Sequence, residues 1–337
     1  MIFEKKYGID LGSSSVKVYS AFRDKIYISR NIMAYRGRTI IAIGNEAYEM
    51  SEKTPADISV TSPMAFGTIA DLELQEILLY KMMRGQDRFP RRNCTVFFAV
   101  PPDMSALEKR AYYQVANGHW IRHTRVYMVE APIADALSLG LPFETTAGSM
   151  LVNIGDQTTR FSVFGSGRMI MSRMVPIGGT QINESIAQEI RRRYDLAIGI
   201  RTANRLKIAM GRLSDQSKDA RRVVGMDAVS GLPREEVISS YVVNAGIMDC
   251  VNELASRMKT FLERIPPQIS YQVAREGIYL TGGSSRIPYL DTYLASYTGF
   301  TFNLSSLYEN STAAGLEQLI HNKELKKYAQ PISQRKL

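Results

Sequence analysis

Residues 7–19 read YGIDLGSSSVKVY, which is typical of a strand, a turn of small residues and a second strand. Residues 151–163 read LVNIGDQTTRFSV and repeat that outline. Two such hairpins in one chain predict two related halves that face a shared cleft. Backbone N–H groups in a turn of Gly and Ser can approach a phosphate closely. The residues that we expect to bind phosphate in the first turn are Gly12, Ser13, Ser14 and Ser15.

The two hairpins differ in chemistry although they share an outline. Asp10 ends the first strand, where a carboxylate suits Mg²⁺ that is held through water. The second hairpin has the amide Asn153 in that place, and the bulkier Asp156 and Gln157 follow its remaining Gly155. Two interpretations of Asp156 stay open, since its carboxylate could repel a γ-phosphate or could replace the missing metal ligand. The shape is therefore kept while the chemistry changes.

A third nucleotide signal is the sequence LTGGS at residues 280–284, where an expected strand runs into two glycines. Glycines at such a place admit a base or a phosphate against the backbone. Alone this signal is weak, but with two hairpins in the right order it is strong. Outside the first turn, the backbone donors that we expect to bind nucleotide are those of Gly155, Thr158, Gly282 and Gly283.

Length and composition set the frame for these motifs. At 337 residues the chain suits two lobes or more, and 45% apolar with 22% charged residues is ordinary for a globular protein. Cys94 and Cys250 lie far apart without metal-ligand spacing, so we interpret them as reduced packing residues. No apolar run approaches the roughly 18 residues of a membrane span, and the N-terminus lacks a signal-peptide pattern. These features predict a cytoplasmic protein.

The net charge of +9 attracts nucleic acid or anionic lipid through long-range fields. Most of the basic residues form scattered clusters at expected helix ends and in the tail, such as residues 191–193 and 323–336. No zinc-ligand spacing, aromatic RNA-binding signature or helix-turn-helix pattern accompanies them. We therefore interpret these clusters as solvated and expect no nucleic-acid partner.

One basic cluster differs from the others. Residues 84–92 read RGQDRFPRR, with four arginines around a single aromatic, and Gly85 and Pro90 indicate a loop. An exposed Phe89 ringed by arginines suits a membrane surface, because the aromatic can enter the interface while the cations meet acidic headgroups. Alternatively, Phe89 packs into the core. The residues alone leave both interpretations open.

Six stretches resemble the MreB family of bacterial actin homologues, in register from about residue 7 to residue 320. They are residues 7–19, IAIGNEA at 41–47, GTIAD at 67–71, VPIGG at 175–179, KIAMG at 207–211 and LTGGS at 280–284. The resemblance implies an α/β chain with the actin and heat-shock-chaperone ATPase fold. In that fold two related lobes, each with a smaller subdomain, clasp ATP and Mg²⁺. The resemblance also implies filaments on the inner face of the cell membrane that organise wall synthesis.

The resemblance adds site residues and partners. It places Thr159, Lys207 and Ser284 among the nucleotide-binding residues. The loop of residues 84–92 falls where the family carries a membrane-inserting apolar pair, of which Phe89 remains beside Arg88. That correspondence favours the membrane interpretation of the loop. The partners that it implies are further copies of the chain, an anionic membrane surface, an active MreB paralogue and wall-synthesis proteins.

The resemblance also predicts the division of the chain. Lobe I has its core in residues 1–32 and 66–147 and a small subdomain in residues 33–65. Lobe II has its core in residues 148–180 and 241–310 and a small subdomain in residues 181–240. Residues 311–337 are expected to return to lobe I and to end in a basic tail.

Several positions depart from the family pattern. Asn153 replaces the metal-side Asp, and Ala131 replaces a Glu that orients the attacking water, with Glu130 displaced by one position. Arg205 stands where the family places a Glu near the ribose, and Asn183 stands where an Asp is usual. A positioned acid or base contributes about 10²- to 10⁴-fold to a rate, so these losses predict weak or absent hydrolysis while binding is kept.

Three functional classes follow from this pattern. The first is an MreB-like filament protein that binds ATP and hydrolyses it slowly or not at all. The second is an active ATPase of the same fold, in which Asp156 or Glu130 compensates. The third is a non-polymerising actin-like membrane adaptor, with which the sequence GSSSVK at residues 12–17 is consistent. The family layout along the whole chain favours the first class.

Overall fold

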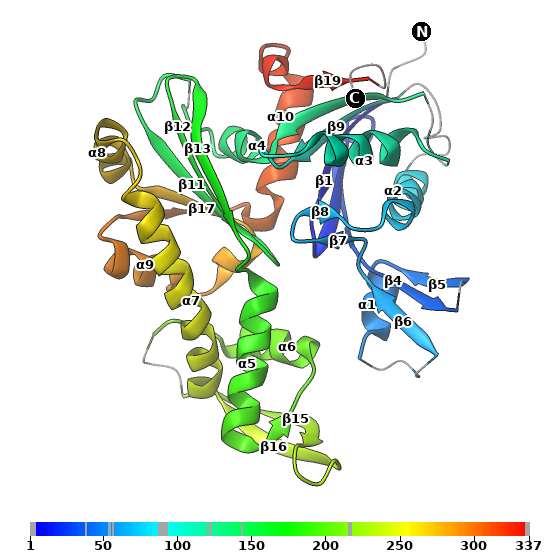
Figure 1. Ribbon diagram of the computed structural model, residues 1–337, viewed down its shortest axis with the longest axis vertical. Coiled ribbons are helices and arrows are strands. Elements are labelled where there is room, and N and C mark those ends of the chain that lie inside the picture. The colour runs from blue at the N-terminus through cyan, green and yellow to red at the C-terminus, as the bar shows by residue number, and fades with distance from the viewer. Residues whose placement is uncertain are drawn as a thin grey trace. The chain divides into compact units, whose positions relative to one another are not determined.

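The computed structural model describes residues 5–37, 39–52, 55, 57–86, 94–119, 121, 123–142, 144–214 and 218–333. Arg88 and Phe89, the expected membrane residues, lie outside these ranges. The chain divides into two compact units (Figure 1). Unit 1 comprises residues 1–141 together with residues 309–337, and unit 2 comprises residues 142–308.

A six-stranded sheet forms the centre of unit 1, in the order β19-β10-β9-β1-β2-β3. Its strands are β1 (Lys5–Leu11), β2 (Ser15–Ser20), β3 (Lys25–Arg30), β9 (Cys94–Val100), β10 (Arg125–Glu130) and β19 (Gln330–Ile332). β9 pairs in parallel with both β1 and β10. Its sequence CTVFFAV is buried at every residue, as expected for a parallel strand that is covered on both faces.

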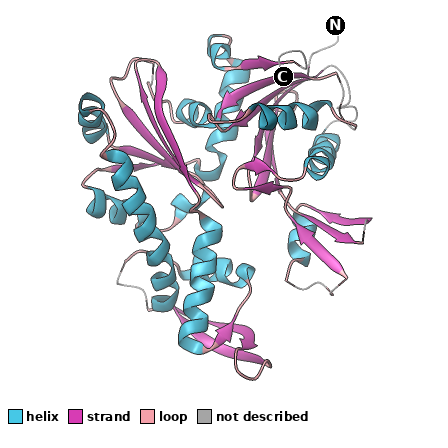
Figure 2. Cartoon of the chain, in the orientation of Figure 1, coloured by secondary structure: helices cyan, strands magenta, loops and turns pink. Residues whose placement is uncertain are grey.

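Helices pack around this sheet (Figure 2). They are α2 (Leu72–Gln86), α3 (Ala106–Asn117), α4 (Ala131–Ser138) and α10 (Ser311–His321), and the short η3 (Glu324–Tyr328) follows α10. The helix α10 contacts both α4 and β1. No side chain can stand at Gly315 in α10, because a Cβ there would overlap the carbonyl oxygen of Ala134 in α4. The close contact at Gly315 thereby holds α10 against α4 in unit 1.

A small three-stranded sheet belongs to the part of unit 1 that the sequence indicates only as polar and rich in turns. Its order is β5-β4-β6, and α1 packs against it. The elements are β4 (Met33–Arg36), β5 (Thr39–Ile43), α1 (Asn45–Met50) and β6 (Ile58–Thr61). Its buried side chains are three alanines, and larger apolar residues pack against them only partly buried, namely Ile32, Met50, Ile58 and Val60. Few large side chains are fully buried there, so the sequence pattern gives little sign of the sheet. The two-stranded β7 (Met64–Ala65) and β8 (Thr68–Ile69) follow.

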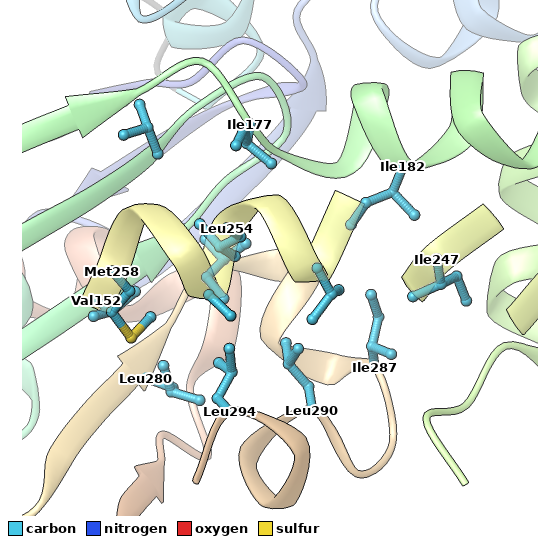
Figure 3. Close-up of a cluster of buried hydrophobic side chains, with 14 of the residues drawn as sticks. Val152, Ile177, Ile182, Ile247, Leu254, Met258, Leu280, Ile287, Leu290 and Leu294 are labelled. Atoms are coloured by element: carbon cyan, nitrogen blue, oxygen red, sulfur yellow. The ribbon is translucent and has the colours of Figure 1, made fainter. Parts of the chain in front are cut away.

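Unit 2 is built on a five-stranded sheet in the order β13-β12-β11-β17-β18. Its strands are β11 (Ser149–Ile154), β12 (Thr159–Gly165), β13 (Arg168–Val175), β17 (Ile278–Thr281) and β18 (Phe302–Leu304). The helices of this part are α5 (Gly179–Tyr194), α7 (Ser240–Leu262), α8 (Pro267–Glu276) and α9 (Leu290–Thr298), with the short η1 (Gly283–Arg286). The short η2 (Tyr308–Asn310) spans the end of unit 2 and the return of the chain to unit 1. Figure 3 shows their shared core, in which Val152 and Leu280 of the sheet lie near Leu254 and Met258 of α7.

A second small sheet belongs to unit 2, in the order β14-β15-β16. It is formed by β14 (Leu196–Ala197), β15 (Ala220–Asp227) and β16 (Pro233–Ser239), with α6 (Ile200–Met210) beside it. The sequence predicts only a polar region up to Glu236. The structure forms a hairpin there, in which Ile238 is buried while Val224, Met226 and Val237 are exposed. Among the described helices, none combines the length and the apolar character that crossing a bilayer requires.

Candidate functional site

The first and second hairpins have the same turn. The backbone N–H of Gly12 donates to the carbonyl oxygen of Ser15 at 3.1 Å, and that of Gly155 donates to Thr158 at 2.9 Å. A Cβ on Gly12 or Gly155 would lie 2.8 or 2.9 Å from the same carbonyl oxygens, so a side chain would force each turn open. The repeated outline in the sequence therefore corresponds to repeated backbone geometry.

The strand register makes the chemical difference between the hairpins explicit. Asp10 is paired with Lys17 across the first hairpin, and Asn153 is paired with Arg160 across the second. The first pair is an ion pair, with 3.0 Å between the Lys17 ammonium and a carboxylate oxygen of Asp10. In the second pair an amide takes the place of the carboxylate, and the Arg160 guanidinium donates to Ser172 at 3.2 Å.

Sequence reasoning missed three residues that support the first turn. Lys17 is only 5% exposed, which is rare for a lysine and ties it to Asp10. The side-chain amide of Asn31 donates to the carbonyl oxygen of Gly12 at 2.9 Å. The Arg30 guanidinium donates to the hydroxyl of Ser14 at 2.7 Å. Strand alternation could have placed Lys17 beside Asp10, but nothing local in the sequence shows the contacts of Arg30 and Asn31.

The second turn is held by residues that follow it much later in the chain. The carbonyl oxygen of Gly155 accepts hydrogen bonds from the Gly179 N–H at 3.0 Å and from the Ser284 hydroxyl at 2.9 Å. The Lys207 ammonium donates to the carbonyl oxygen of Gly179 at 3.1 Å. Four segments of unit 2 that are separate in the sequence thus meet around the second turn. Only the fold brings them together, since Ser284 is 129 positions from Gly155.

The two glycines after β17 have different roles in this arrangement. Gly282 has φ of +88°, a backbone conformation that favours glycine, and a Cβ there would overlap the carbonyl oxygen of Ile154. Gly283 begins η1, and Ser284 follows within it. The close approach of Gly282 to β11 explains why the Ser284 hydroxyl can reach the second turn.

The electrostatics of the unit 2 site centre on Lys207 and Asp156. Burial lowers the pKa of Lys207 to about 8, and the nearby Asp156 carboxylate acts in the opposite direction. An oxygen of that carboxylate accepts a hydrogen bond from the Thr180 hydroxyl at 3.1 Å. A bound anion would favour the charged form of Lys207. Thr159 is fully buried, and its hydroxyl donates to the Ile177 carbonyl oxygen at 2.7 Å.

The structure describes the positions at which the sequence departs from the family pattern. Glu130 ends β10, and Ala131 begins α4 directly after it. Arg205 is exposed on α6. Asn183 is buried in α5, and no hydrogen-bond partner reaches its side-chain oxygen. Asp135, a buried carboxylate within α4, accepts a hydrogen bond from Thr312 at 2.6 Å and so joins α4 to α10.

These turns fit a phosphate ligand, because glycine lets each turn close tightly and a lysine lies nearby. For a hydrated cation, each unit offers one carboxylate at its turn, Asp10 in unit 1 and Asp156 in unit 2. Both carboxylates lie beside a cationic or hydroxyl group of the chain itself. Within the described ranges, no group of three or more His, Cys, Asp or Glu side chains is placed to hold a metal ion.

Comparison with known proteins agrees with this geometry. The family model described as MreB/Mbl protein matches residues 4–328. The cell shape-determining protein MreB of Escherichia coli strain K12 is 29% identical over 308 residues, which cover 88% of each chain. The cell shape-determining protein Mbl of Bacillus subtilis strain 168 is 29% identical over 302 residues, covering 87% of this chain and 89% of Mbl.

Solved structures show the same similarity in three dimensions. MreB5 of Spiroplasma citri bound to ADP has a TM-score of 0.89 at 28% identity, covering 96% of this chain and 98% of MreB5. The same protein bound to AMPPNP has a TM-score of 0.90. A MamK double helical filament has a TM-score of 0.75 at 19% identity and supports the actin-like fold alone. The fold class predicted from the sequence is confirmed, and the chain belongs to the MreB/Mbl family.

Proposed function

We propose that this chain is a cell-shape cytoskeletal protein that binds ATP, assembles with itself on the membrane and hydrolyses ATP slowly or not at all. The observation that carries the proposal is the pair of equivalent turns, of which the first keeps its acid and the second has an amide. Support comes from the family membership, from relatives named as cell shape-determining proteins and from MreB5 bound to ADP and to AMPPNP.

Nucleotide binding rests on donors that do not need a catalytic carboxylate. The N–H groups of Gly12 and Gly155 close the turns, so we assign the phosphate to the remaining backbone N–H groups of these turns, with Lys17 and Lys207 supplying positive charge nearby. Mg²⁺, when bound, would be held through water by Asp10 and would neutralise phosphate charge. Asp156 stays open between repelling a γ-phosphate and serving as a replacement ligand. Isothermal titration with ATP and with AMPPNP, each with and without Mg²⁺, tests this step. Absence of binding under all four conditions would contradict the proposal.

Slow hydrolysis follows from the residues that are missing. Ala131 offers no group to orient a water, and Asn153 offers no charge on the metal side. Each loss costs about 10²- to 10⁴-fold in rate. An active ATPase is the second candidate, favoured by the Asp156 carboxylate that lies beside Lys207 and Thr180. A phosphate-release assay separates the two, because only the active enzyme turns over many times and loses activity in Asp156→Asn.

Self-assembly and membrane association complete the proposal. The family match extends over residues 4–328 and so includes surfaces remote from the turns. We place the protein in the cytoplasm, at the inner face of the membrane, with wall-synthesis proteins or an active paralogue as further partners. The Phe89→Ala variant should float less well with anionic liposomes, and Arg91→Ala and Arg92→Ala should make flotation more sensitive to salt. If all three variants float as well as the unmodified chain, residues 84–92 have no membrane role.

We also propose the subdomain division of the sequence. The small sheet of β4, β5 and β6 falls in residues 33–65, and that of β14, β15 and β16 falls in residues 181–240. Each has its own contacts and stands apart from the central sheet of its unit. Limited proteolysis with and without ATP tests whether these segments respond to nucleotide as separate bodies.

A further inference from the structure

We propose that Arg30 binds the phosphates of the nucleotide at the first turn, with the Ser14 hydroxyl as its partner. This inference rests on the nucleotide binding proposed above and adds a ligand that the sequence pattern does not assign. Arg30 ends β3, and the strand register pairs it with Ser15, the last of the four turn residues expected to bind phosphate. Its guanidinium donates to the Ser14 hydroxyl at 2.7 Å. The cation therefore lies at the turn itself.

Arg30 differs from the other cation of the first turn in having no carboxylate partner. The Lys17 ammonium lies 3.0 Å from a carboxylate oxygen of Asp10, so its charge is compensated within the chain. Within the described ranges, no carboxylate forms an ion pair with the Arg30 guanidinium. A half-buried cation without a counter-ion favours an anionic ligand, and the phosphates of a nucleotide are such a ligand.

Arg30 and Ser14 together present more donors than the chain itself uses. A guanidinium carries five N–H donors in a planar fork, and the bond to Ser14 uses one of them. The Ser14 hydroxyl accepts in that bond, so its own hydrogen can be donated to a ligand. A planar fork suits two oxygens of one phosphate group, and such charge-assisted bonds are the strong ones. The pair is therefore chemically suited to hold a phosphate.

The backbone around Arg30 is attached to the turn and to α1. The Arg30 N–H donates to the side-chain oxygen of Asn45 in α1 at 3.2 Å. The N–H of the next residue, Asn31, donates to the Ser14 carbonyl oxygen at 3.0 Å. The Asn31 side chain is buried and also bonds to Gly12. The backbone that carries the guanidinium is thus fixed before any ligand arrives, which reduces the entropic cost of binding.

An aromatic ring supports the guanidinium itself. The central carbon of the Arg30 guanidinium lies 4.5 Å from the centre of the Tyr48 ring in α1. Gly44, which precedes α1, has φ of +66°, and a Cβ there would overlap the Ser29 hydroxyl, so α1 begins close to β3. A ring attracts a cation without using its N–H donors. The contact with Tyr48 therefore orients Arg30 and links the phosphate site to the small sheet on which α1 packs.

The test measures the affinity of the full chain for ATP by isothermal titration at two salt concentrations. Arg30→Gln should weaken ATP binding at least about tenfold and reduce its salt dependence, because a charge-assisted bond is lost. Arg30→Lys should recover part of the affinity, since it returns the charge without the planar fork. Arg36→Gln is the matched control, because the exposed Arg36 guanidinium pairs with Asp57 at 3.0 Å. It should bind ATP like the unmodified chain.

Three further measurements separate phosphate binding from a structural role. Adenosine, which has no phosphate, should bind Arg30→Gln and the unmodified chain equally. Ser14→Ala with Arg30→Gln should lose less ATP affinity than the two single changes added together, because both act on one site. Tyr48→Leu should weaken ATP binding about threefold, whereas Tyr48→Phe keeps the ring and the affinity.

The outcomes separate this inference from the proposal on which it rests. If the unmodified chain binds ATP and Arg30→Gln binds it equally well, Arg30 is not a ligand and the proposed function stands. If Arg36→Gln loses as much affinity as Arg30→Gln, net charge explains the effect and the inference is overturned. If Arg30→Gln loses adenosine and ATP binding equally and has a lower thermal midpoint without ligand, its role is structural and the inference is wrong. If the unmodified chain binds neither ATP nor ADP, the proposed nucleotide binding fails and this inference fails with it.

Discussion

Lys17 and Asp10 show how one residue changes the chemistry of a turn. Their side chains are 7% and 18% exposed, and their charged atoms lie 3.0 Å apart. The Asp10 carboxylate and the Lys17 ammonium therefore compensate each other's charge within the chain. The first turn therefore carries its own cation, and a phosphate that enters it meets a compensated charge and not an isolated carboxylate.

Lys17→Met should destabilise the protein, because it leaves the half-buried Asp10 carboxylate without its ammonium. We expect a loss of about 2 kcal/mol in the free energy of unfolding. The double variant Lys17→Met with Asp10→Asn should recover part of that loss, since no charge is then left behind. Urea unfolding of the unmodified chain, the two single variants Lys17→Met and Asp10→Asn, and the double variant measures the coupling. Strictly additive effects would show that the pair makes no net contribution.

Restoring the missing carboxylates should increase turnover. Ala131→Glu with Asn153→Asp returns acids to two positions whose strand and helix frame is kept. We expect phosphate release to rise by at least about tenfold in the double variant, while each single change does little, because residues that act as a unit are not additive. Vigorous release by the unmodified chain would sink this idea and would point to Asp156 or Glu130 as the substitute.

The charge of Lys207 predicts how nucleotide affinity depends on pH. Its folded-state pKa of about 8 lies below its ordinary value of 10.5, so between these values the unfolded chain holds a proton that the folded chain has lost. Stability without ligand should therefore rise with pH across that window. Affinity for ATP should instead fall as pH rises through about 8, because the ammonium loses its charge. Lys207→Arg should flatten the binding profile, and an unchanged slope would exclude Lys207 as a ligand.

At the scale of elements, close helix contact fixes where the chain returns. The helix α10 packs against α4 and β1 at two glycines, Gly315 and Gly8. A Cβ on Gly8 would lie 2.8 Å from the Cβ of Leu316, so the same helix also excludes a side chain on the strand. The packing of α10 on β1 and α4 therefore requires that neither Gly8 nor Gly315 carries a side chain.

Gly315→Ala should therefore be strongly destabilising. The new methyl group meets the backbone of Ala134, which cannot move aside as a flexible side chain could. We expect a loss of about 3 kcal/mol, at the upper end for an overpacked core. Gly85→Ala is the matched control, because Gly85 lies in α2 with open space around it and alanine is the better helix former. Its thermal midpoint should stay equal or rise, and equal midpoints for both variants would contradict the packing argument.

At the scale of the whole molecule, the family likeness extends well beyond the turns. The matched structures cover 96% of this chain or more at a TM-score near 0.9. A protein that kept only the nucleotide chemistry would have no reason to keep the two small sheets of β4 to β6 and β14 to β16. The retention of both sheets favours a role in which outer surfaces are used, as assembly requires.

Self-assembly should be visible at high protein concentration. Light scattering and electron microscopy, with and without ATP and with and without lipid, should show polymers of the chain. Assembly should tolerate AMPPNP, because the proposed role of the nucleotide is to be bound and not to be hydrolysed. Monomers alone under every condition would contradict the filament proposal and would favour the adaptor alternative.

The sequence by itself determined the fold class and the outline of the candidate site. The two hairpins and the Gly282-Gly283 pair are local signals, because turn chemistry and strand alternation depend on neighbours in sequence. Asn153 and Ala131 could also be identified from the sequence, because their positions within the motifs match positions at which the family pattern has an acid. The membrane assignment of Phe89 remains a prediction, since that residue lies outside the described ranges.

Only the tertiary structure decided which distant residues support the turns. The contacts of Ser284 with Gly155 and of Lys207 with Gly179 join residues 129 and 28 positions apart. Neither the burial of Lys17 nor the hairpin of β15 and β16 could be predicted from the local sequence. Both depend on contacts with elements that lie elsewhere in the chain. Local periodicity records which face of an element is apolar, whereas burial and charge pairing arise only when separate elements pack together.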